Sequence, residues 1–314
     1  MAVIGIDLGG TKLSAAVFGD EGLPCDKETV ALDGRTGSVV GEMILNQVRR
    51  LHSACEEPVE AIGVSVPGIS DTGTGTVWAP NIPGWESYPL SEEIGSYLSD
   101  DTIKVAVESD RSCYILGETW KGAAHGVNDA IFIAVGTGIG AGILIDGVIL
   151  RGHADIAGSI GWMALDRPYK DAYTSCGCFE YYASGDGIAR TARLLLEKEN
   201  ACGTLGELDA KTITAHDVFR AYDEGDRLAA MVLDNTVELW GMAVANLVSI
   251  FNPEMIVFGG GVFGPAIRFL ERIHSAASQW AQPISIQQVT LVASELGEDA
   301  GLIGAGRLAM MQRS

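Results

Sequence analysis

The chain has 314 residues, with 21 Lys and Arg against 41 Asp and Glu, and its formal net charge is −20. This excess of negative charge argues against duplex nucleic acid and against an anionic membrane surface as partners, because both are bound through clustered Lys and Arg. Hydrophobic residues make up 47% of the chain and 40 residues are glycine, so we expect a large buried core with many tight turns and not a disordered protein.

The predicted elements alternate between strands and helices along the chain. Apolar runs that end in glycine, proline or aspartate predict strands at 2–7, 13–18, 60–66, 103–107, 130–135, 141–145 and 255–258. Apolar residues at helical spacing predict helices at 38–56, 110–120 and 226–251. Such alternation is typical of an α/β protein, and the length favours two lobes.

The location is predicted from three features. The longest uncharged stretch, 130–145, contains four glycines and is shorter than the roughly 20 residues that cross a bilayer. Asp7 interrupts the first apolar run before the core of a signal peptide could form. Six cysteines in a chain of this length indicate reduced thiols. We therefore expect a cytoplasmic protein.

The first motif is Asp7-Leu8-Gly9-Gly10-Thr11-Lys12, which lies between two predicted strands. Glycines allow backbone N–H groups to face a phosphate, and the Thr11 hydroxyl adds a donor. A carboxylate at a strand end, here Asp7, suits Mg²⁺ held through water, because this ion keeps much of its hydration shell. The alternatives are a tight hairpin that binds no ligand and, for Lys12, a merely exposed side chain.

Two further glycine-rich segments follow. Residues 136–142 lie between two predicted strands and do not open a helix, so a second phosphate hairpin fits them better than a dinucleotide fingerprint. Residues 259–261 follow a strand and would allow close approach to an adenosine. We therefore predict nucleotide binding at Gly9, Gly10, Thr11, Lys12, Gly136, Thr137, Gly138, Gly140, Gly260 and Gly261.

These motifs, followed by Ala300-Gly301-Leu302-Ile303-Gly304-Ala305, occur in an order that resembles the ROK family of sugar kinases and repressors. The resemblance covers nearly the whole chain. It implies the two-lobed actin-like (ribonuclease H-like) ATPase fold with a nucleotide cleft between the lobes, and ATP and Mg²⁺ as cofactors. The expected small lobe spans 1–118 with a C-terminal helix at 298–314, and the large lobe, with the oligomer interface, spans 119–297.

Repressors of this family carry an N-terminal helix-turn-helix domain. Here the first predicted strand begins at residue 2, and the negative charge disfavours DNA. We therefore expect a kinase.

The resemblance implies that Asp110, in Val107-Glu108-Ser109-Asp110, is the catalytic base. A carboxylate at this strand end could accept the proton of an attacking hydroxyl while Mg²⁺ and glycine amides steady the phosphoryl group. Without the resemblance, an Asp ahead of a helix would be interpreted as an N-cap.

The acceptor site departs from the family pattern. The resemblance implies acceptor binding by Gly68, Asn81, Ser109, Asp110, Ser159, Trp162 and Glu180. The family has Asn where this chain has Ser109, and Glu-Ile-Gly-His where it has Ser159-Ile160-Gly161-Trp162. Because that Glu and His bind hydroxyls near the anomeric end, a short neutral Ser and an apolar Trp favour a modified sugar or a cyclitol over plain glucose.

A structural zinc site is not expected. Zinc-binding relatives have the His followed by Cys-x-Cys-Gly-x-x-Gly-Cys-x-Glu, whereas this chain has Trp162 at the His position and only Cys176-Gly177-Cys178 before Phe179-Glu180. Two thiolates do not complete a tetrahedral site. Cys202 and His153 leave a rearranged site open.

The sequence therefore predicts an ATP- and Mg²⁺-dependent kinase that phosphorylates a primary hydroxyl of a hexose-like small molecule, as a homodimer or homotetramer. Three alternatives stay open: an ordinary glucokinase or broad hexokinase, a sugar-binding regulator without catalysis, and polyphosphate in place of ATP as the donor.

Overall fold

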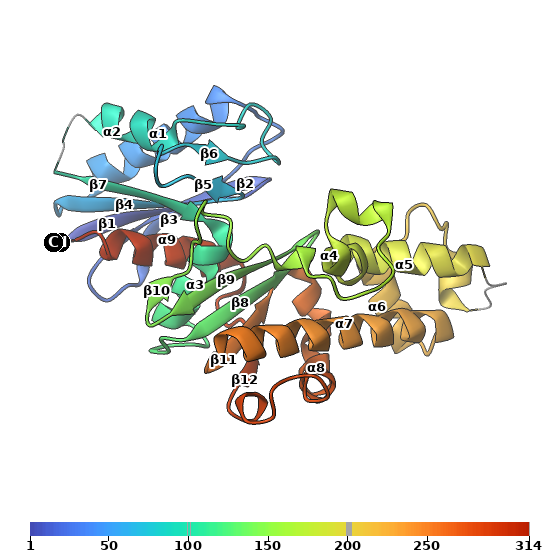
Figure 1. Cartoon of the computed structure of the whole chain (residues 1–314). Coiled ribbons are helices and arrows are strands. Elements are labelled where there is room, and N and C mark those ends of the chain that lie inside the picture. The colour runs from blue at the N-terminus through green and yellow to red at the C-terminus, as the bar shows by residue number, and fades with distance from the viewer. Residues whose placement is uncertain (99, 101, 199–202, 314) are drawn as a thin grey trace. The chain divides into compact units, whose positions relative to one another are not determined.

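The computed structural model describes residues 1–98, 100, 102–198 and 203–313. The chain divides into two compact units (Figure 1). The first comprises Met1–Asn128, Gly142–Ala157 and Glu295–Ser314, and the second comprises Asp129–Ala141 and Gly158–Ser294.

The first unit is built on a sheet of strand order β3-β2-β1-β4-β7. Its strands are β1 (Ala2–Leu8), β2 (Lys12–Phe18), β3 (Pro24–Ala31), β4 (Val59–Val66) and β7 (Lys104–Ser109), and a small hairpin of β5 (Ile69–Ser70) and β6 (Val77–Trp78) stands apart. Strands β1, β4 and β7 run parallel, with Asp7 paired to Ser65 and Ser65 paired to Glu108. These residues therefore meet at the carboxyl edge of the sheet, where α/β folds place their ligands.

Helices cover both faces of this sheet (Figure 1). Alternation along β1 explains why: Ile4 and Ile6 join one core cluster with residues of α1 (Ser38–Ala54) and α2 (Leu90–Leu98). Val3 joins the other cluster, with residues of α9 (Ala300–Met310). Helix α3 (Asp110–Lys121) packs along α9.

The small residues of α9 allow very close packing. A Cβ on Gly63 of β4 would lie 2.0 Å from the Ala305 carbonyl oxygen, and one on Gly304 would lie 1.8 Å from the Cys113 carbonyl oxygen of α3. Glycine is required at both positions because any side chain would meet backbone atoms. The interpretation of the terminal small residues as packing residues is confirmed.

The second sheet has the strand order β10-β9-β8-β11-β12. Strands β8, β11 and β12 and the start of β9 belong to the second unit, whereas the rest of β9 and β10 belong to the first. The strands are β8 (Ala130–Val135), β9 (Ile139–Ile145), β10 (Val148–Ile149), β11 (Met255–Gly259) and β12 (Thr290–Ala293). The helices are α4 (Cys178–Ala183), α5 (Gly185–Lys198), α6 (Ala215–Asp223), α7 (Arg227–Phe251) and α8 (Leu270–Ala277). Among the described residues α7 alone is long and apolar enough to cross a membrane, but 67% of its apolar window is buried inside the protein, as in a core helix.

The division into units differs from the sequence-based one at residues 119–128, 142–157 and 295–297, all of which the sequence analysis assigned to the large lobe. The largest of these segments is 142–157. Gly142 of β9 lies against α3, where a Cβ would come within 1.9 Å of the Arg111 carbonyl oxygen. Arg151 and Asp155 also bond to Glu108 and Thr72 of the first unit. These contacts join residues far apart in the sequence, so no local sequence pattern predicts them.

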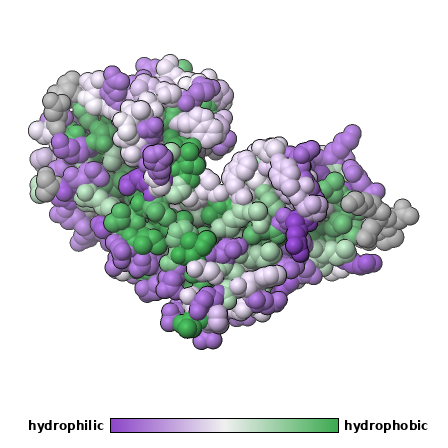
Figure 2. Space-filling view, in the orientation of Figure 1, coloured by the Kyte–Doolittle hydropathy of each residue, from purple (hydrophilic) through white to green (hydrophobic). Residues whose placement is uncertain are grey.

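Apolar side chains are exposed on this returning segment. Val148 is 61% exposed, and Leu150 and Ile156 are also exposed. Figure 2 shows hydrophobic residues gathered over β9 and β10, whereas hydrophilic and weakly polar residues predominate over α1 and α2.

Candidate active site

The first glycine hairpin lies at the carboxyl edge of the first unit's sheet. Strand β1 ends at Leu8 and returns as β2, and the Gly9 N–H donates to the Lys12 carbonyl oxygen at 2.9 Å. Lys12 Nζ forms an ion pair with Glu298 Oε2 at 2.5 Å. The Lys12 ammonium group therefore has an acidic partner, Glu298, in this structure.

Asp7 is held beneath this hairpin by the first turn of α9. A Cβ on Gly301 would lie 2.5 Å from Asp7 Oδ1 and 2.7 Å from Oδ2, so only glycine leaves room for the carboxylate. Burial raises the pKa of Asp7 to about 6, and the negative charge of Asp110 adds to this effect. A carboxylate whose charge is unfavourable in this way would gain from a nearby cation.

This donor chemistry fits Mg²⁺, which prefers oxygen ligands and retains waters. Asp7 is the residue that would hold it. Among the described residues, no group of three or more His, Cys, Asp or Glu side chains is arranged to bind a metal by itself, so water and phosphate oxygens would have to complete the shell.

Asp110 is the first residue of α3. Its Oδ1 accepts from the Arg111 N–H at 2.7 Å, and its Oδ2 accepts from the Tyr114 hydroxyl at 3.4 Å. Burial raises the pKa of Asp110 above its ordinary value, and these bonds act in the opposite direction. The N-cap of α3 is Ser109, whose hydroxyl accepts from the Ser112 N–H, so the alternative interpretation of Asp110 as the cap is wrong.

Two further predicted acceptor residues belong to the first unit. Gly68 follows β4, and a Cβ there would lie 2.0 Å from the Trp78 carbonyl oxygen. Asn81 is exposed, and its Cβ lies 4.0 Å from where a Cβ on Gly10 would be. The structure thus brings Asn81 beside the first glycine hairpin.

In the second unit, Glu180 of α4 supports the second glycine hairpin. Glu180 Oε2 accepts from the Ile139 N–H at 2.6 Å. A Cβ on Gly138 would lie 2.7 Å from the same oxygen, so glycine is needed for the carboxylate to reach the hairpin. Burial raises the pKa of Glu180, and the Ile139 N–H lowers it.

Trp162 lies near Glu180. It ends a short 3₁₀ turn, Ile160–Trp162, and its side chain is 57% exposed. A Cβ on Gly161 would lie 3.0 Å from Glu180 Oε2, and a Cβ on Gly177 would lie 2.5 Å from the Trp162 Cα. Gly161 of the turn thus lies close to Glu180, and Gly177, which precedes α4, lies close to the Trp162 backbone. Acceptor binding by Ser159, Trp162 and Glu180 stays a prediction.

A cavity of about 410 Å³ lies within the second unit. It brings together Gly136 and Thr137 of the second hairpin and Gly261 after β11, three of the predicted nucleotide-binding residues. Gly138, Gly140 and Gly260 are not among its lining residues. Gly260 instead has a φ of +88°, and a Cβ there would lie 2.4 Å from the Val135 carbonyl oxygen, so it shapes the turn.

The cavity also includes residues that the sequence analysis did not find. The remaining lining residues come from α5, α6 and the segments beside them: Gly185, Asp186, Ala189, Arg193, Ile213, Thr214, Ala215, His216, Phe219, Val262 and Pro265. Arg193 donates from a terminal nitrogen to the Ile213 carbonyl oxygen at 2.6 Å. The sequence reading took His216 for an ordinary side chain, and no motif marks it, because its place depends on how α6 packs against α5.

The residues at the zinc positions do not fit a zinc site. Counted back from Glu180, the three cysteines of the family pattern fall on Asp171, Tyr173 and Cys178. The Tyr173 hydroxyl instead donates to Asp166 Oδ2 at 2.9 Å and lies 2.9 Å from the Tyr182 hydroxyl. A hydrogen-bonded aromatic cluster thus occupies this region, and Cys202 lies outside the described residues.

Residues 3–312 match the ROK family. The chain belongs to that family. A glucokinase of Halalkalibacterium halodurans is 34% identical over 99% of this chain and 96% of its own length. The chain is also similar to two solved structures. A ROK family glucokinase from Streptomyces griseus in complex with glucose and AMPPNP is 31% identical with a TM-score of 0.77, and the match covers 99% of this chain and 100% of that chain. A ROK hexokinase from Thermus thermophilus is 29% identical with a TM-score of 0.82, and the match covers 99% of both chains. The expected actin-like ATPase fold is confirmed.

Proposed function

We propose that this ROK family member transfers the γ-phosphoryl group of ATP to a primary hydroxyl of a hexose-like acceptor. The class of enzyme, an ATP:sugar phosphotransferase of the ROK type, follows from family membership over nearly the whole chain and from the kinases to which it is similar. The role of each residue and the identity of the acceptor are the proposal.

The observation that carries the mechanism is the position of Asp110. It lies at the sheet edge that also bears Asp7 and the first glycine hairpin, and burial raises its pKa, which makes it a stronger base. The acceptor hydroxyl attacks the γ-phosphorus and gives its proton to Asp110 as the bond to the β-phosphate oxygen breaks. The N–H groups of Gly10 and Thr11 would stabilise negative charge on the phosphoryl oxygens, since the Gly9 N–H already donates to the Lys12 carbonyl oxygen.

Magnesium, when bound, would neutralise charge on the phosphates. Asp7 would orient the waters of its shell, and Gly301 fixes Asp7 for this task because the glycine is what leaves room for the carboxylate.

The donor site is proposed at the cavity of the second unit. Thr137 would bind phosphate through its N–H and hydroxyl groups, whereas the Gly136 N–H already donates to the Gly138 carbonyl oxygen at 3.0 Å. The space along α5 and α6 would hold the nucleoside. A cavity of this kind favours ATP over polyphosphate, which has no nucleoside to fill it.

The acceptor is proposed to be a modified sugar or a cyclitol. Glu180 retains the carboxylate of the family pattern, but Ser159 and Trp162 replace the Glu and His that would bind hydroxyls near the anomeric end. The exposed Trp162 ring offers an apolar face to the ligand. A site that lacks such hydrogen-bonding partners selects poorly for a substrate that presents those hydroxyls.

A panel of glucose, mannose, fructose, amino sugars and cyclitols, assayed with MgATP, tests the acceptor. Glucose should be turned over poorly, and the double variant Ser159→Glu/Trp162→His should raise kcat/KM for glucose by at least about tenfold. Efficient glucose phosphorylation by the unaltered protein would contradict the modified-sugar proposal and favour an ordinary glucokinase, the name of its relative from Halalkalibacterium halodurans.

Asp110→Asn tests the base. The variant should lose phosphoryl transfer with every acceptor while still binding nucleotide. If the unaltered protein bound sugar tightly but transferred no phosphoryl group, a sugar-binding regulator would replace the kinase. We further propose a cytoplasmic homodimer or homotetramer, which sedimentation of the purified protein would test.

A further inference from the structure

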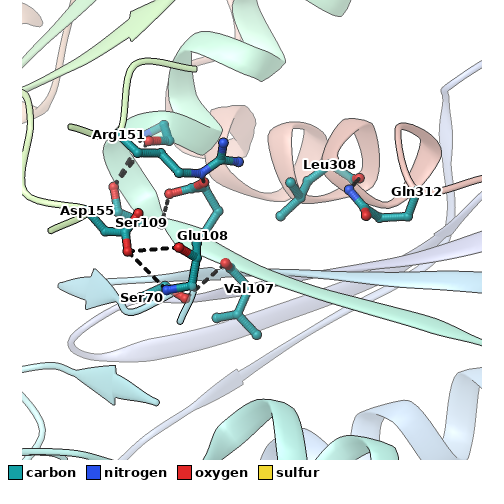
Figure 3. Close-up of polar contacts among 10 residues, drawn as sticks. Ser70, Val107, Glu108, Ser109, Arg151, Asp155, Leu308 and Gln312 are labelled. Atoms are coloured by element: carbon teal, nitrogen blue, oxygen red, sulfur yellow. Dashed lines mark hydrogen bonds and ion pairs between the residues drawn. The ribbon is translucent and has the colours of Figure 1, made fainter. Parts of the chain in front are cut away.

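Glu108 is a buried carboxylate that the proposed mechanism does not use. It lies on β7 two residues before Asp110, and its side chain is 5% exposed. Its Oε1 accepts from the Ser109 N–H at 3.0 Å, and its Oε2 accepts from Arg151 Nε at 2.7 Å (Figure 3). Both oxygens of this buried carboxylate therefore have a hydrogen-bond partner.

The partner, Arg151, lies far from Glu108 in the sequence, on the loop after β10. That loop, residues 150–157, is fixed to the first unit a second time, because Asp155 Oδ2 accepts from the Thr72 N–H and from the Thr72 hydroxyl, each at 3.0 Å. The Ala157 N–H donates to the Arg151 carbonyl oxygen at 3.0 Å and closes the loop on itself. Figure 3 shows Arg151 and Asp155 directed toward the end of β7 and the neighbouring β5 segment.

The same contacts fix the backbone that leads into the base. The Ser70 hydroxyl donates to the Val107 carbonyl oxygen at 2.9 Å, and Glu108 accepts from the Ser109 N–H (Figure 3). Ser109 is the N-cap of α3, so its backbone sets the direction of the first helical turn, in which Asp110 is the first residue. A bond that fixes Ser109 therefore also fixes the direction of the Asp110 side chain.

We propose that Glu108 and Arg151 are positioning residues for Asp110: the ion pair holds the base in its reactive orientation and ties it to loop 150–157. This inference rests on the proposed function, in which Asp110 is the base. Neither side chain touches the reacting atoms. The loop continues in sequence to Ser159, one of the predicted acceptor residues.

Four variants test the pair: Glu108→Gln, Arg151→Gln, the double variant of these two, and the conservative Arg151→Lys. A misplaced base should lower kcat by about 10- to 100-fold in each single Gln variant, with both KM values within about threefold of the unaltered protein. The double variant should lose little more than the larger single effect, since both changes break one interaction. Arg151→Lys should recover part of kcat.

The pH profile separates positioning from electrostatic tuning. If the pair only orients Asp110, kcat falls at every pH and the acidic limb of the profile stays where it is in the unaltered protein. A shift of the acidic limb in Glu108→Gln, which removes the negative charge, would overturn the proposal, because the pair would then act on the basicity of Asp110.

Arg50→Gln is the matched control. Arg50 is 34% exposed against 36% for Arg151, and it also forms ion pairs, with Asp26 and Glu28, within the first unit. It should keep full kcat. If Arg151→Gln matched Arg50→Gln in kcat, the proposal would be wrong.

Two further measurements distinguish a failure of the positioning proposal from a loss of folding and from a failure of the proposed function. Because Glu108 is buried, its substitution can reduce the yield of folded protein, and in that case Arg151→Gln, at a half-exposed side chain, decides the question alone. Asp110→Asn checks the function on which the inference rests. An active Asp110→Asn protein refutes the base itself, whereas an inactive one beside fully active Glu108→Gln and Arg151→Gln proteins refutes the positioning pair only.

Discussion

Replacing Gly301 by Ala should inactivate the enzyme without unfolding it. The new Cβ would lie 2.5 Å from Asp7 Oδ1, whereas atoms in ordinary contact are about 3.5 Å apart, so the carboxylate or the helix must move by about 1 Å. Helix α9 has little freedom to move away, because its Gly304 lies against the Cys113 carbonyl oxygen of α3 and its Ala305 carbonyl oxygen lies against Gly63 of β4. The Asp7 side chain must therefore give way.

The size of the effect follows from that displacement. A misplacement of about 1 Å near a reacting group costs on the order of 100-fold in rate, so we expect kcat to fall by about that factor and the Mg²⁺ concentration for half-maximal rate to rise. Stability should change by no more than about 3 kcal/mol, because overpacking costs about 1–3 kcal/mol and a helical Gly→Ala change returns up to about 1 kcal/mol.

The assay is steady-state kinetics over a range of MgCl₂, with Tm measured on the same samples. Gly95→Ala is the control, because Gly95 lies in α2 and a Cβ there would meet nothing within 4 Å. It should raise Tm slightly and keep kcat. A Gly301→Ala enzyme with unaltered kcat and Mg²⁺ dependence would show that Asp7 does not need this packing.

Three further predictions concern separate parts of the molecule. Tyr114→Phe removes the hydrogen bond from the Tyr114 hydroxyl to Asp110, which favours the ionised carboxylate, so the pKa of Asp110 should rise. The acidic limb of the kcat/KM profile should then move to higher pH by up to about one unit, whereas the control Tyr97→Phe should leave the profile unchanged. Tyr173→Phe loses the bonds to Asp166 and Tyr182 and should destabilise the second unit by about 1–3 kcal/mol with kcat retained; an equal effect from the exposed Tyr169→Phe would refute the role of the hydroxyl. Arg193→Met should raise KM for ATP by about tenfold with kcat retained, and an unchanged KM would mean that the nucleoside binds elsewhere than in the cavity of α5 and α6.

The parts of the fold that the sequence predicts are those with a strong local pattern. The expected helix at 226–251 is α7 (Arg227–Phe251) and the expected strand at 255–258 is β11 (Met255–Gly259), because each has an unbroken apolar pattern with glycine or Asn-Pro after it. The strand β3 (Pro24–Ala31) was not predicted. Its exposed Asp26 and Lys27 and the partly buried Glu28 give it no apolar alternation, as is common for a strand at a sheet edge.

The residues of the candidate site likewise fall into those that local motifs predict and those that only the tertiary fold brings together. Asp7, the glycine hairpins and Asp110 lie in motifs that can be read from neighbouring residues. Arg193 and His216 line the cavity only because α5 and α6 pack together, and Arg151 reaches Glu108 only because a loop returns to the first unit. Such contacts depend on the tertiary fold, and a single sequence without aligned relatives does not contain them.

The packing of α9 also has a consequence for synthesis of the chain. Gly301 provides the space for Asp7, but α9 leaves the ribosome after every other element of the first unit. Until then β1 and β4 lack the helix that covers one of their faces, and the apolar residues Val3 and Ala61 stay uncovered. The enzyme therefore becomes competent late in synthesis, and a truncated product that lacks α9 would be an inactive, aggregation-prone species instead of a partially active kinase.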